Sequence, residues 1–259
     1  MTCGEIIAQI EKDYPTSCAL EWDNVGLLAG RMDKEVKRVY IGLDATDSVI
    51  REAADKGADL LLTHHPLLFH GINRVTDQDF LGNRVLNLIR SDISYYAMHT
   101  NYDVVRMAQL AAARLGWKGA RPLEPAGDEA EDQGLGQIAD LEQEMTLEEL
   151  GRQVKEVFGL PDVRIFGDPG KRVKRAAILP GSGKSAIPEA LRQQAQVLIT
   201  GDMGHHEGID AVAQGLAVID GGHYGIEHIF VEDMRNYLEE HFPELKVETE
   251  PVRHPFVTV

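Results

Sequence analysis

The sequence predicts an α/β fold built from two related halves, and three observations support this. Short apolar runs of strand character alternate with helical segments, which is the order typical of a parallel sheet. Residues 36–63 and 173–200 align without gaps, and 11 of the 28 aligned residues are identical. Polar residues able to bind a ligand follow strands in both halves. Because ligands bind at the carboxyl ends of strands in open α/β sheets, we expect the functional site at that edge.

The first half begins with a helix, which is followed by alternating strands and helices. Ile6, Ile7 and Ile10 recur at helical spacing, and Thr2 is a suitable N-cap for that helix. Short apolar runs are expected to form strands at residues 36–43, 58–63 and 94–98. Helices are expected at residues 48–56, 80–91 and 105–115.

The second half repeats the strand–helix–strand order. The identical residues are spread over both strands and the helix, up to Thr63 and its counterpart Thr200. Chance similarity between two such units is the alternative, but the gapless alignment favours duplication. An acidic run at residues 128–132 is expected to be a solvated loop that joins the halves. We therefore place the first repeat at residues 1–125 and the second at residues 126–259.

Composition narrows the chemistry and the compartment. The formal net charge of −16 disfavours a nucleic-acid partner, because phosphate backbones are bound by clustered Lys and Arg. A small anionic substrate stays compatible, because a metal ion can supply local positive charge. The two cysteines, Cys3 and Cys18, are too few for a disulfide framework or a cysteine-rich zinc site. The sequence has no signal peptide and no apolar run of about 20 residues, so we expect a cytoplasmic protein without a membrane span.

Two adjacent histidines follow the second expected strand. His64 and His65 precede Pro66, which stops the strand. Neighbouring side chains of an extended chain point to opposite sides, so the two imidazoles are better placed to serve two neighbouring ions than to chelate one. The alternative is a pair of polar residues at a strand exit. Histidine and carboxylate ligands without a thiolate suit Zn, Fe or Mn.

Each half also has a histidine followed four residues later by an acidic residue. His99 and Asp103 follow a strand of the first half, and His223 and Glu227 follow an apolar run of the second. Residues four apart share one face of a helix. A carboxylate can bridge two cations, so both pairs are candidate metal ligands. The alternative for each pair is a helix N-terminus whose acidic residue satisfies backbone N–H groups.

The histidines are concentrated at these strand ends. Eight of the ten lie in or beside the clusters: His64, His65, His70, His99, His205, His206, His223 and His228. This favours a centre of two metal ions about 3.5–4 Å apart, an arrangement used for hydrolysis. Residues 181–185 resemble a phosphate-binding loop, but Ile178 stands where that motif needs glycine. We therefore interpret them as a turn.

Together these motifs resemble those of a known family. The sequence is similar to the NIF-three-like dinuclear-metal proteins, also called YbgI-like and often labelled GTP cyclohydrolase I type 2 homologues. The stretches that carry the resemblance run over nearly the whole chain: residues 21–27, 61–67, 99–103, 200–206 and 221–227.

The resemblance implies a fold, a ligand set and an assembly. It implies two intertwined α/β repeats with mixed, mostly parallel sheets and a metal site between them, in a ring-shaped homohexamer. It also implies that Glu227 bridges two divalent ions, and that Asp103 rather than His99 is a ligand. Some family members carry an extra domain in the middle, for which this chain is too short. The implied metal ligands are His64, His65, Asp103, His223 and Glu227.

Two functional hypotheses follow. The leading one is a metal-dependent hydrolase acting on a nucleotide or related small molecule, and the family label points to ring opening of GTP. In this hypothesis His99 and His206 are candidate general acids or bases, or alternatively orient a metal ligand. Asp23 and Asn24 are candidate substrate contacts. The second hypothesis is a non-enzymatic metal-holding or regulatory interaction protein, as the origin of the family's name suggests.

Overall fold

The computed structural model describes residues 1–127 and 132–259, so most of the predicted acidic loop lies outside the described residues. The chain divides into two compact units, each discontinuous in the sequence. Unit 1 consists of Met1–Tyr102 and Phe230–Val252, and unit 2 of Asp103–Ile229 and Arg253–Val259. The two units are therefore interleaved along the chain. The predicted division after residue 125 falls at the end of a strand of unit 2.

Unit 1 is built on a five-stranded sheet with the order β1-β4-β3-β2-β11. Strands β11, β2, β3 and β4 run parallel, and β1 pairs antiparallel with β4. The central strand β3 is buried throughout, which agrees with its uninterrupted apolar sequence. The strands are β1 (Gly26–Ala29), β2 (Arg38–Gly42), β3 (Leu60–Thr63), β4 (Ser94–Ala97) and β11 (Lys246–Thr249).

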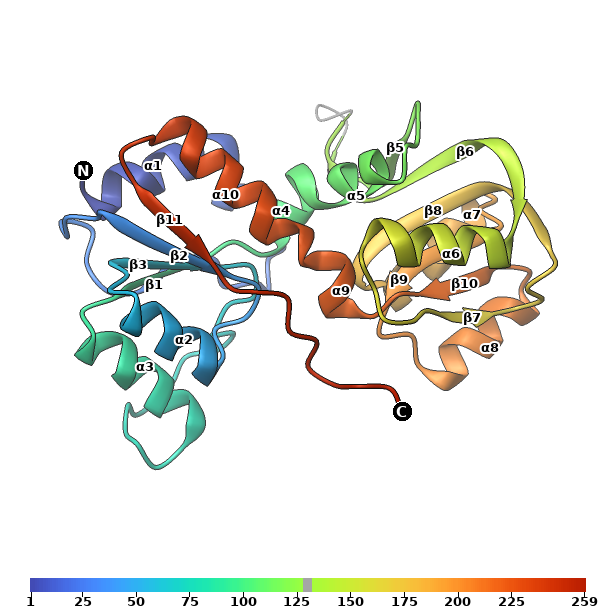
Figure 1. Ribbon diagram of the computed structural model, residues 1–259. Coiled ribbons are helices and arrows are strands. Elements are labelled where there is room, and N and C mark those ends of the chain that lie inside the picture. The colour runs from blue at the N-terminus through green and yellow to red at the C-terminus, as the bar shows by residue number, and fades with distance from the viewer. Residues whose placement is uncertain (128–131) are drawn as a thin grey trace. The chain divides into compact units, whose positions relative to one another are not determined.

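Helices cover both faces of this sheet. α1 and α10 lie on one face, and α2 and α3 lie on the other (Figure 1). The predicted cap of the first helix is confirmed, because Thr2 and Glu5 form a capping box. On the opposite face Ile50 of α2 packs in a cluster with Leu61 of β3. The helices are α1 (Cys3–Asp13), η1 (Thr16–Cys18), α2 (Asp47–Asp55), α3 (Phe80–Arg90), α4 (Thr100–Tyr102) and α10 (Ile229–His241).

Unit 2 is built on a six-stranded sheet with the order β5-β6-β8-β9-β10-β7. Strands β8, β9 and β10 run parallel, whereas β5–β6, β6–β8 and β10–β7 are antiparallel pairs. The strands are β5 (Arg121–Pro125), β6 (Gly134–Thr146), β7 (Arg164–Phe166), β8 (Arg172–Ser182), β9 (Val197–Gly201) and β10 (Ala217–Asp220).

The helices of unit 2 are shorter and are placed at strand ends and over the sheet. α6 lies over the opposite face of the sheet from α7 (Figure 1). Small residues such as Ala190 of α7 and Ala211 of α8 pack with Leu198 and Val218 of the sheet. Among the described residues, no helix is both long and apolar enough to cross a bilayer. The helical elements are η2 (Asp103–Met107, a π-helical turn), α5 (Ala108–Arg114), α6 (Leu147–Val157), η3 (Gly183–Ala186), α7 (Ile187–Arg192), α8 (His205–Ala213) and α9 (His223–Glu227).

The strand pairings of the two units follow the sequence repeat. Val39 of β2 pairs with Leu60 of β3, and Ala176 of β8 pairs with Val197 of β9. Both residues of the second pair lie 137 positions after their counterparts, which is the offset between the aligned segments 36–63 and 173–200. The predicted α/β fold with mixed sheets is confirmed. The sheet of unit 1 is mostly parallel, whereas three of the five strand pairs of unit 2 are antiparallel. The duplicated strand–helix–strand segment supplies one parallel strand pair to each sheet, β2–β3 and β8–β9.

Candidate metal centre

Strand β3 carries two imidazoles to the carboxyl edge of the sheet of unit 1. His64 is buried, and its Nδ1 lies 2.9 Å from the carbonyl oxygen of Met98. The Nδ1 of His65 lies 2.8 Å from Oδ1 of Asp44, which follows β2. Carbonyl and carboxylate oxygens only accept, so in each neutral ring Nδ1 carries the proton and Nε2 carries the lone pair. Metal-binding histidines have this arrangement, because the partner of Nδ1 orients the ring.

The backbone of His65 is fixed by three hydrogen bonds. Its N–H donates to the carbonyl of Leu43 at 3.0 Å. Its carbonyl accepts from Thr63 Oγ1 at 2.8 Å and from the Tyr95 hydroxyl at 3.0 Å. Burial raises the pKa of Tyr95, so this hydroxyl keeps its proton and remains a donor. The position of the second imidazole is thus set by the fold itself.

A third imidazole comes from the end of β4. The Nδ1 of His99 lies 2.9 Å from Oδ1 of Asp23, whose side chain is wholly buried. The other oxygen of Asp23 accepts from the backbone N–H of Thr100 at 2.9 Å and from its hydroxyl at 2.6 Å. Burial alone would raise the pKa of Asp23, but hydrogen bonds from His99 and Thr100 outweigh it and lower the pKa to about 2. Asp23 is therefore ionised at neutral pH and orients the His99 ring.

These three imidazoles converge on one place within unit 1. One ring nitrogen each of His64, His65 and His99 lies within 4.8 Å of the other two, and the ring centroids are 4.9, 5.2 and 5.5 Å apart. We term these residues the trihistidine cluster. Since the Nδ1 atoms face oxygen acceptors, metal binding by these rings would use the Nε2 atoms. The trihistidine cluster lies at the strand-end edge of the sheet, where the sequence predicts the functional site.

In unit 2, a histidine and a carboxylate of α9 form a second group of metal-ligand type. His223 Nε2 lies 2.9 Å from Oε2 of Glu227, and His223 Nδ1 lies 2.9 Å from Oδ2 of Asp202. Glu227 is buried, whereas Asp202 is exposed. The four-residue spacing brings His223 and Glu227 together on one helical turn, as the sequence predicts. The imidazole is therefore placed between two carboxylates.

Glycines allow this group to form. A Cβ at Gly201 would overlap the backbone nitrogen of His223, so only glycine lets β9 approach the start of α9 this closely. Gly181 has φ +77°, and a Cβ there would overlap Oε1 of Glu227 and lie 3.5 Å from Nε2 of His223. The glycine-rich segment at residues 181–185, predicted to be a turn, thus passes directly beside the buried carboxylate.

Asp103, the remaining predicted ligand, opens the π-helical turn η2 and is half-buried. This turn interrupts the helix predicted over residues 105–115, which begins as an α-helix only at Ala108. Single π-helical turns are often found at functional sites.

The sequence matches the family model described as Duf34/NIF3 (NGG1p interacting factor 3) over residues 1–255. The chain belongs to this family. The resemblance drawn from the strand-end motifs is therefore confirmed. A NIF3-related protein from Bacillus cereus has the same fold, with a TM-score of 0.91 at 24% identity, covering 100% of this chain and 99% of that one.

Named relatives in the NIF3 family are similar over both units. A Clostridium perfringens protein named GTP cyclohydrolase 1 type 2 homolog is 34% identical over 229 residues, which cover 88% of this chain and 87% of the relative. A Lactococcus lactis protein of the same name is 32% identical over the full length of both chains. The structure of reduced HcgD from Methanocaldococcus jannaschii aligns with a TM-score of 0.83 and 30% identity, covering 96% of this chain and 97% of that one.

The remaining predicted site residues are His206, Asp23 and Asn24. His206 is exposed on the first turn of α8, with its ring 5.1 Å from that of His205. Among the described residues it belongs to no group of metal-ligand type, and its catalytic role stays a prediction. The Asn24 side chain donates to the carbonyl of Leu68 and so joins two loops beside the trihistidine cluster. The substrate contacts predicted for Asp23 and Asn24 also stay predictions.

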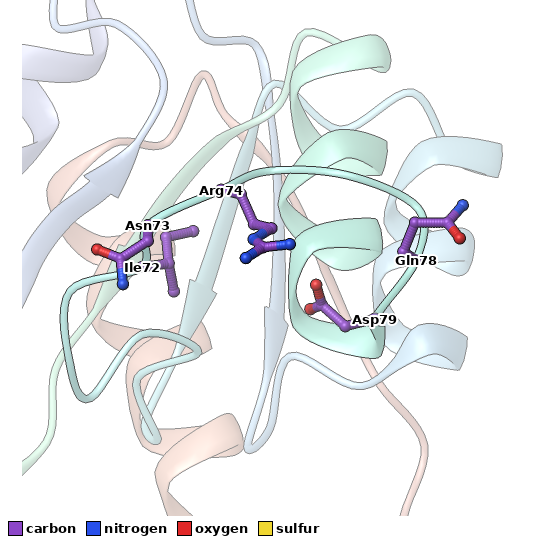
Figure 2. A pocket seen from close by; sticks show the side chains of 5 residues that line it. All are labelled: Ile72, Asn73, Arg74, Gln78 and Asp79. Atoms are coloured by element: carbon purple, nitrogen blue, oxygen red, sulfur yellow. The ribbon is translucent and has the colours of Figure 1, made fainter.

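A hollow of about 430 Å³ lies in the loop that leads into α3 (Figure 2). Asp79 at its rim is the N-cap of α3 and accepts from the Gly82 N–H. None of the residues that line this hollow is a histidine, so the hollow shares no residue with the trihistidine cluster. Its lining residues are Ile72, Asn73, Arg74, Gln78 and Asp79.

Two carboxylates beside the histidines were not among the predicted site residues. Asp44 orients His65, and Asp202 orients His223. Each carboxylate follows a buried strand, so the rule that singled out the strand-end histidines could have found them.

Proposed function

We propose that this member of the NIF3 family is a dinuclear metal-dependent hydrolase that acts on a nucleotide or a related small molecule. The trihistidine cluster is the observation that supports it most directly, because it places two imidazoles with oriented rings, His64 and His65, beside a third imidazole, His99, that can transfer a proton. The substrate class is suggested by relatives named GTP cyclohydrolase 1 type 2 homolog.

The proposed ligands of the two ions combine imidazoles and carboxylates, a donor set that suits Zn, Fe or Mn. The surroundings of His223 support its assignment, because both ring nitrogens face carboxylates. Its Nε2 lies 2.9 Å from Oε2 of Glu227, so this nitrogen and the carboxylate could bind the same ion once the ring is neutral. In this proposal Glu227 bridges the ions, and the full set is His64, His65, Asp103, His223 and Glu227.

His99 is the group that we assign to proton transfer. Bound divalent ions would lower the pKa of a coordinated water and polarise the bond to be cleaved. Asp23 holds the proton of the neutral His99 ring on Nδ1, which leaves Nε2 able to accept a proton. The ionised carboxylate also stabilises the imidazolium that this transfer forms. Thr100 donates two hydrogen bonds to Asp23 and so holds the carboxylate in position to orient the neutral His99 ring and to stabilise its imidazolium.

The assembly and compartment are part of the same proposal. By resemblance to the family we propose a cytoplasmic homohexamer. Light scattering of the purified protein should then give about six times the 28.7 kDa mass of one chain. A monomeric mass would contradict this part of the proposal.

A paired measurement of metal content and turnover tests the hydrolase. Metal-loaded protein is incubated with GTP and a panel of nucleotides and phosphodiesters. His64→Ala should lose metal, whereas His99→Gln should lose about 10²–10⁴-fold in rate while keeping it. His241→Ala is the control, since His241 is an exposed histidine of α10 outside the trihistidine cluster. Full metal content without turnover of any substrate would instead support a metal-holding interaction protein, as the family description "interacting factor" suggests.

A further inference from the structure

Two exposed aromatic side chains contact the trihistidine cluster. Trp22 is 60% exposed and Phe69 is 43% exposed. Their ring centroids lie 5.8 Å and 5.7 Å from that of His99, with the ring planes inclined at 73° and 81° to it. Large aromatic rings usually bury most of their surface, so two exposed rings at one imidazole indicate a binding surface.

The loops that carry these rings are tied to the rest of unit 1. Asp23, next to Trp22, has a buried side chain that is hydrogen-bonded at the end of β4. Asn24 donates from its side chain to the carbonyl of Leu68, next to Phe69. The two loops are thus joined to each other close to both rings. The exposure of the rings is therefore a feature of an anchored backbone.

The charges near the rings favour recognition by stacking. Residues 20–24 contain two carboxylates, Glu21 and Asp23, and no basic residue, and residues 67–69 are uncharged. This surface therefore does not attract an anion by its own charge. A flat ring, in contrast, gains from stacking on an aromatic face whatever its substituents.

We propose that Trp22 and Phe69 form a stacking surface for a flat heteroaromatic ring of the substrate, such as a nucleobase. This inference rests on the proposed function and deepens it by naming the part of the substrate that the protein recognises. His99 is a direct neighbour of both aromatic rings. A substrate ring stacked on Trp22 or Phe69 would lie beside the trihistidine cluster. The substrate atoms next to that ring would then face His99, the residue assigned to proton transfer.

The two tryptophans of the chain allow a direct binding test. In a Trp117→Phe background, Trp22 is the only tryptophan. The Nε1 of Trp117 is buried and has no hydrogen-bond partner among the described residues, so this substitution removes no hydrogen bond that the structure contains. The metal-loaded protein is titrated with GMP, AMP, CMP, nicotinamide mononucleotide and ribose 5-phosphate while Trp22 fluorescence is recorded. At least one of the four ring compounds should quench the emission, and ribose 5-phosphate should not.

Variants separate stacking from other causes. Phe69→Ala should raise the Kd of the ring compound about 10-fold. Phe80→Ala should leave it unchanged, because Phe80 is an exposed ring of α3 that packs with Arg84 instead of the cluster. Equal binding of ribose 5-phosphate and the ring compounds, no binding of any of them, or an unchanged Kd in Phe69→Ala would overturn the inference. A Trp22 signal that responds to protein concentration alone would assign the rings to a contact between copies and would also overturn it.

Measurements of nucleotide binding and of turnover test the stacking surface and the hydrolase independently. Quenching by a nucleotide that is never hydrolysed would uphold the stacking surface and contradict the hydrolase. Hydrolysis that proceeds equally well in Phe69→Ala and Trp22→Ala would uphold the hydrolase and contradict the stacking surface.

Discussion

Replacing Gly181 by alanine should displace the carboxylate of Glu227 and reduce the metal content of the protein. Gly181 has φ +77°, where an L side chain costs about 1–2 kcal/mol. The new Cβ would overlap Oε1 of Glu227, and relief requires that oxygen to move by roughly 1 Å to reach van der Waals contact. The end of a glutamate side chain can move that far, but ligand positions must be held within about 0.5 Å.

Thermal unfolding and elemental analysis of the same preparations test this prediction. Gly181→Ala should lower the Tm by about 2–8 °C and lose at least one of the two proposed ions. Gly116→Ala is the matched control, because Gly116 has φ +73° and a Cβ there meets no described atom within 4 Å. It should show a similar loss of Tm with full metal content. Full metal content in Gly181→Ala as well would refute the reasoning that Glu227 must occupy its present position to bind metal.

Three further predictions concern groups that orient the site. Asp202→Asn should lower metal affinity about 10–100-fold in a chelator competition, because Asp202 orients His223, and an unchanged affinity would contradict that role. Gly201→Ala should cost about 1–3 kcal/mol in urea unfolding, because its Cβ would overlap the backbone of His223, which cannot rotate away, and an unchanged midpoint would count against it. The pKa of Asp23 is lowered to about 2 from 3.8, so its ionised form contributes about 2 kcal/mol of stability above pH 4. That contribution should be lost as the pH falls from about 4 to 2, and Asp23→Asn should show a smaller loss than the native protein over this range.

The parallel core of each unit could be predicted from the sequence, because hydrophobic pattern and burial coincide there. The observed β2, α2 and β3 fall within the ranges expected at residues 36–43, 48–56 and 58–63, give or take one residue. The π-helical turn at Asp103 was not predicted, because its apolar spacing is close to that of an α-helix.

The carboxylates that orient the histidines could not be paired from the sequence. Asp44 lies 21 residues before His65, and Asp202 lies 21 residues before His223. In both units the carboxylate follows one strand and the histidine follows the neighbouring strand. The pairing therefore depends on which strands are adjacent, and the hydrophobic pattern of a strand does not specify its neighbours.

The correspondence between the two histidine–acid pairs is also inexact. Ala97 and Asp220 occupy equivalent places, opposite Thr63 and Thr200 in the ladders. His99 lies two positions after Ala97, whereas His223 lies three positions after Asp220, so the second half has one extra residue before its histidine. Spacing alone could not say whether His99 or Asp103 binds metal, and the structure places His99 with His64 and His65.

The metal content of the purified protein tests the central claim most directly. Elemental analysis of the native chain should give close to two divalent ions per chain, and Glu227→Gln should lose both, because the substitution removes the proposed bridge. One ion per native chain, or two ions retained after Glu227→Gln, would contradict a dinuclear centre bridged by Glu227.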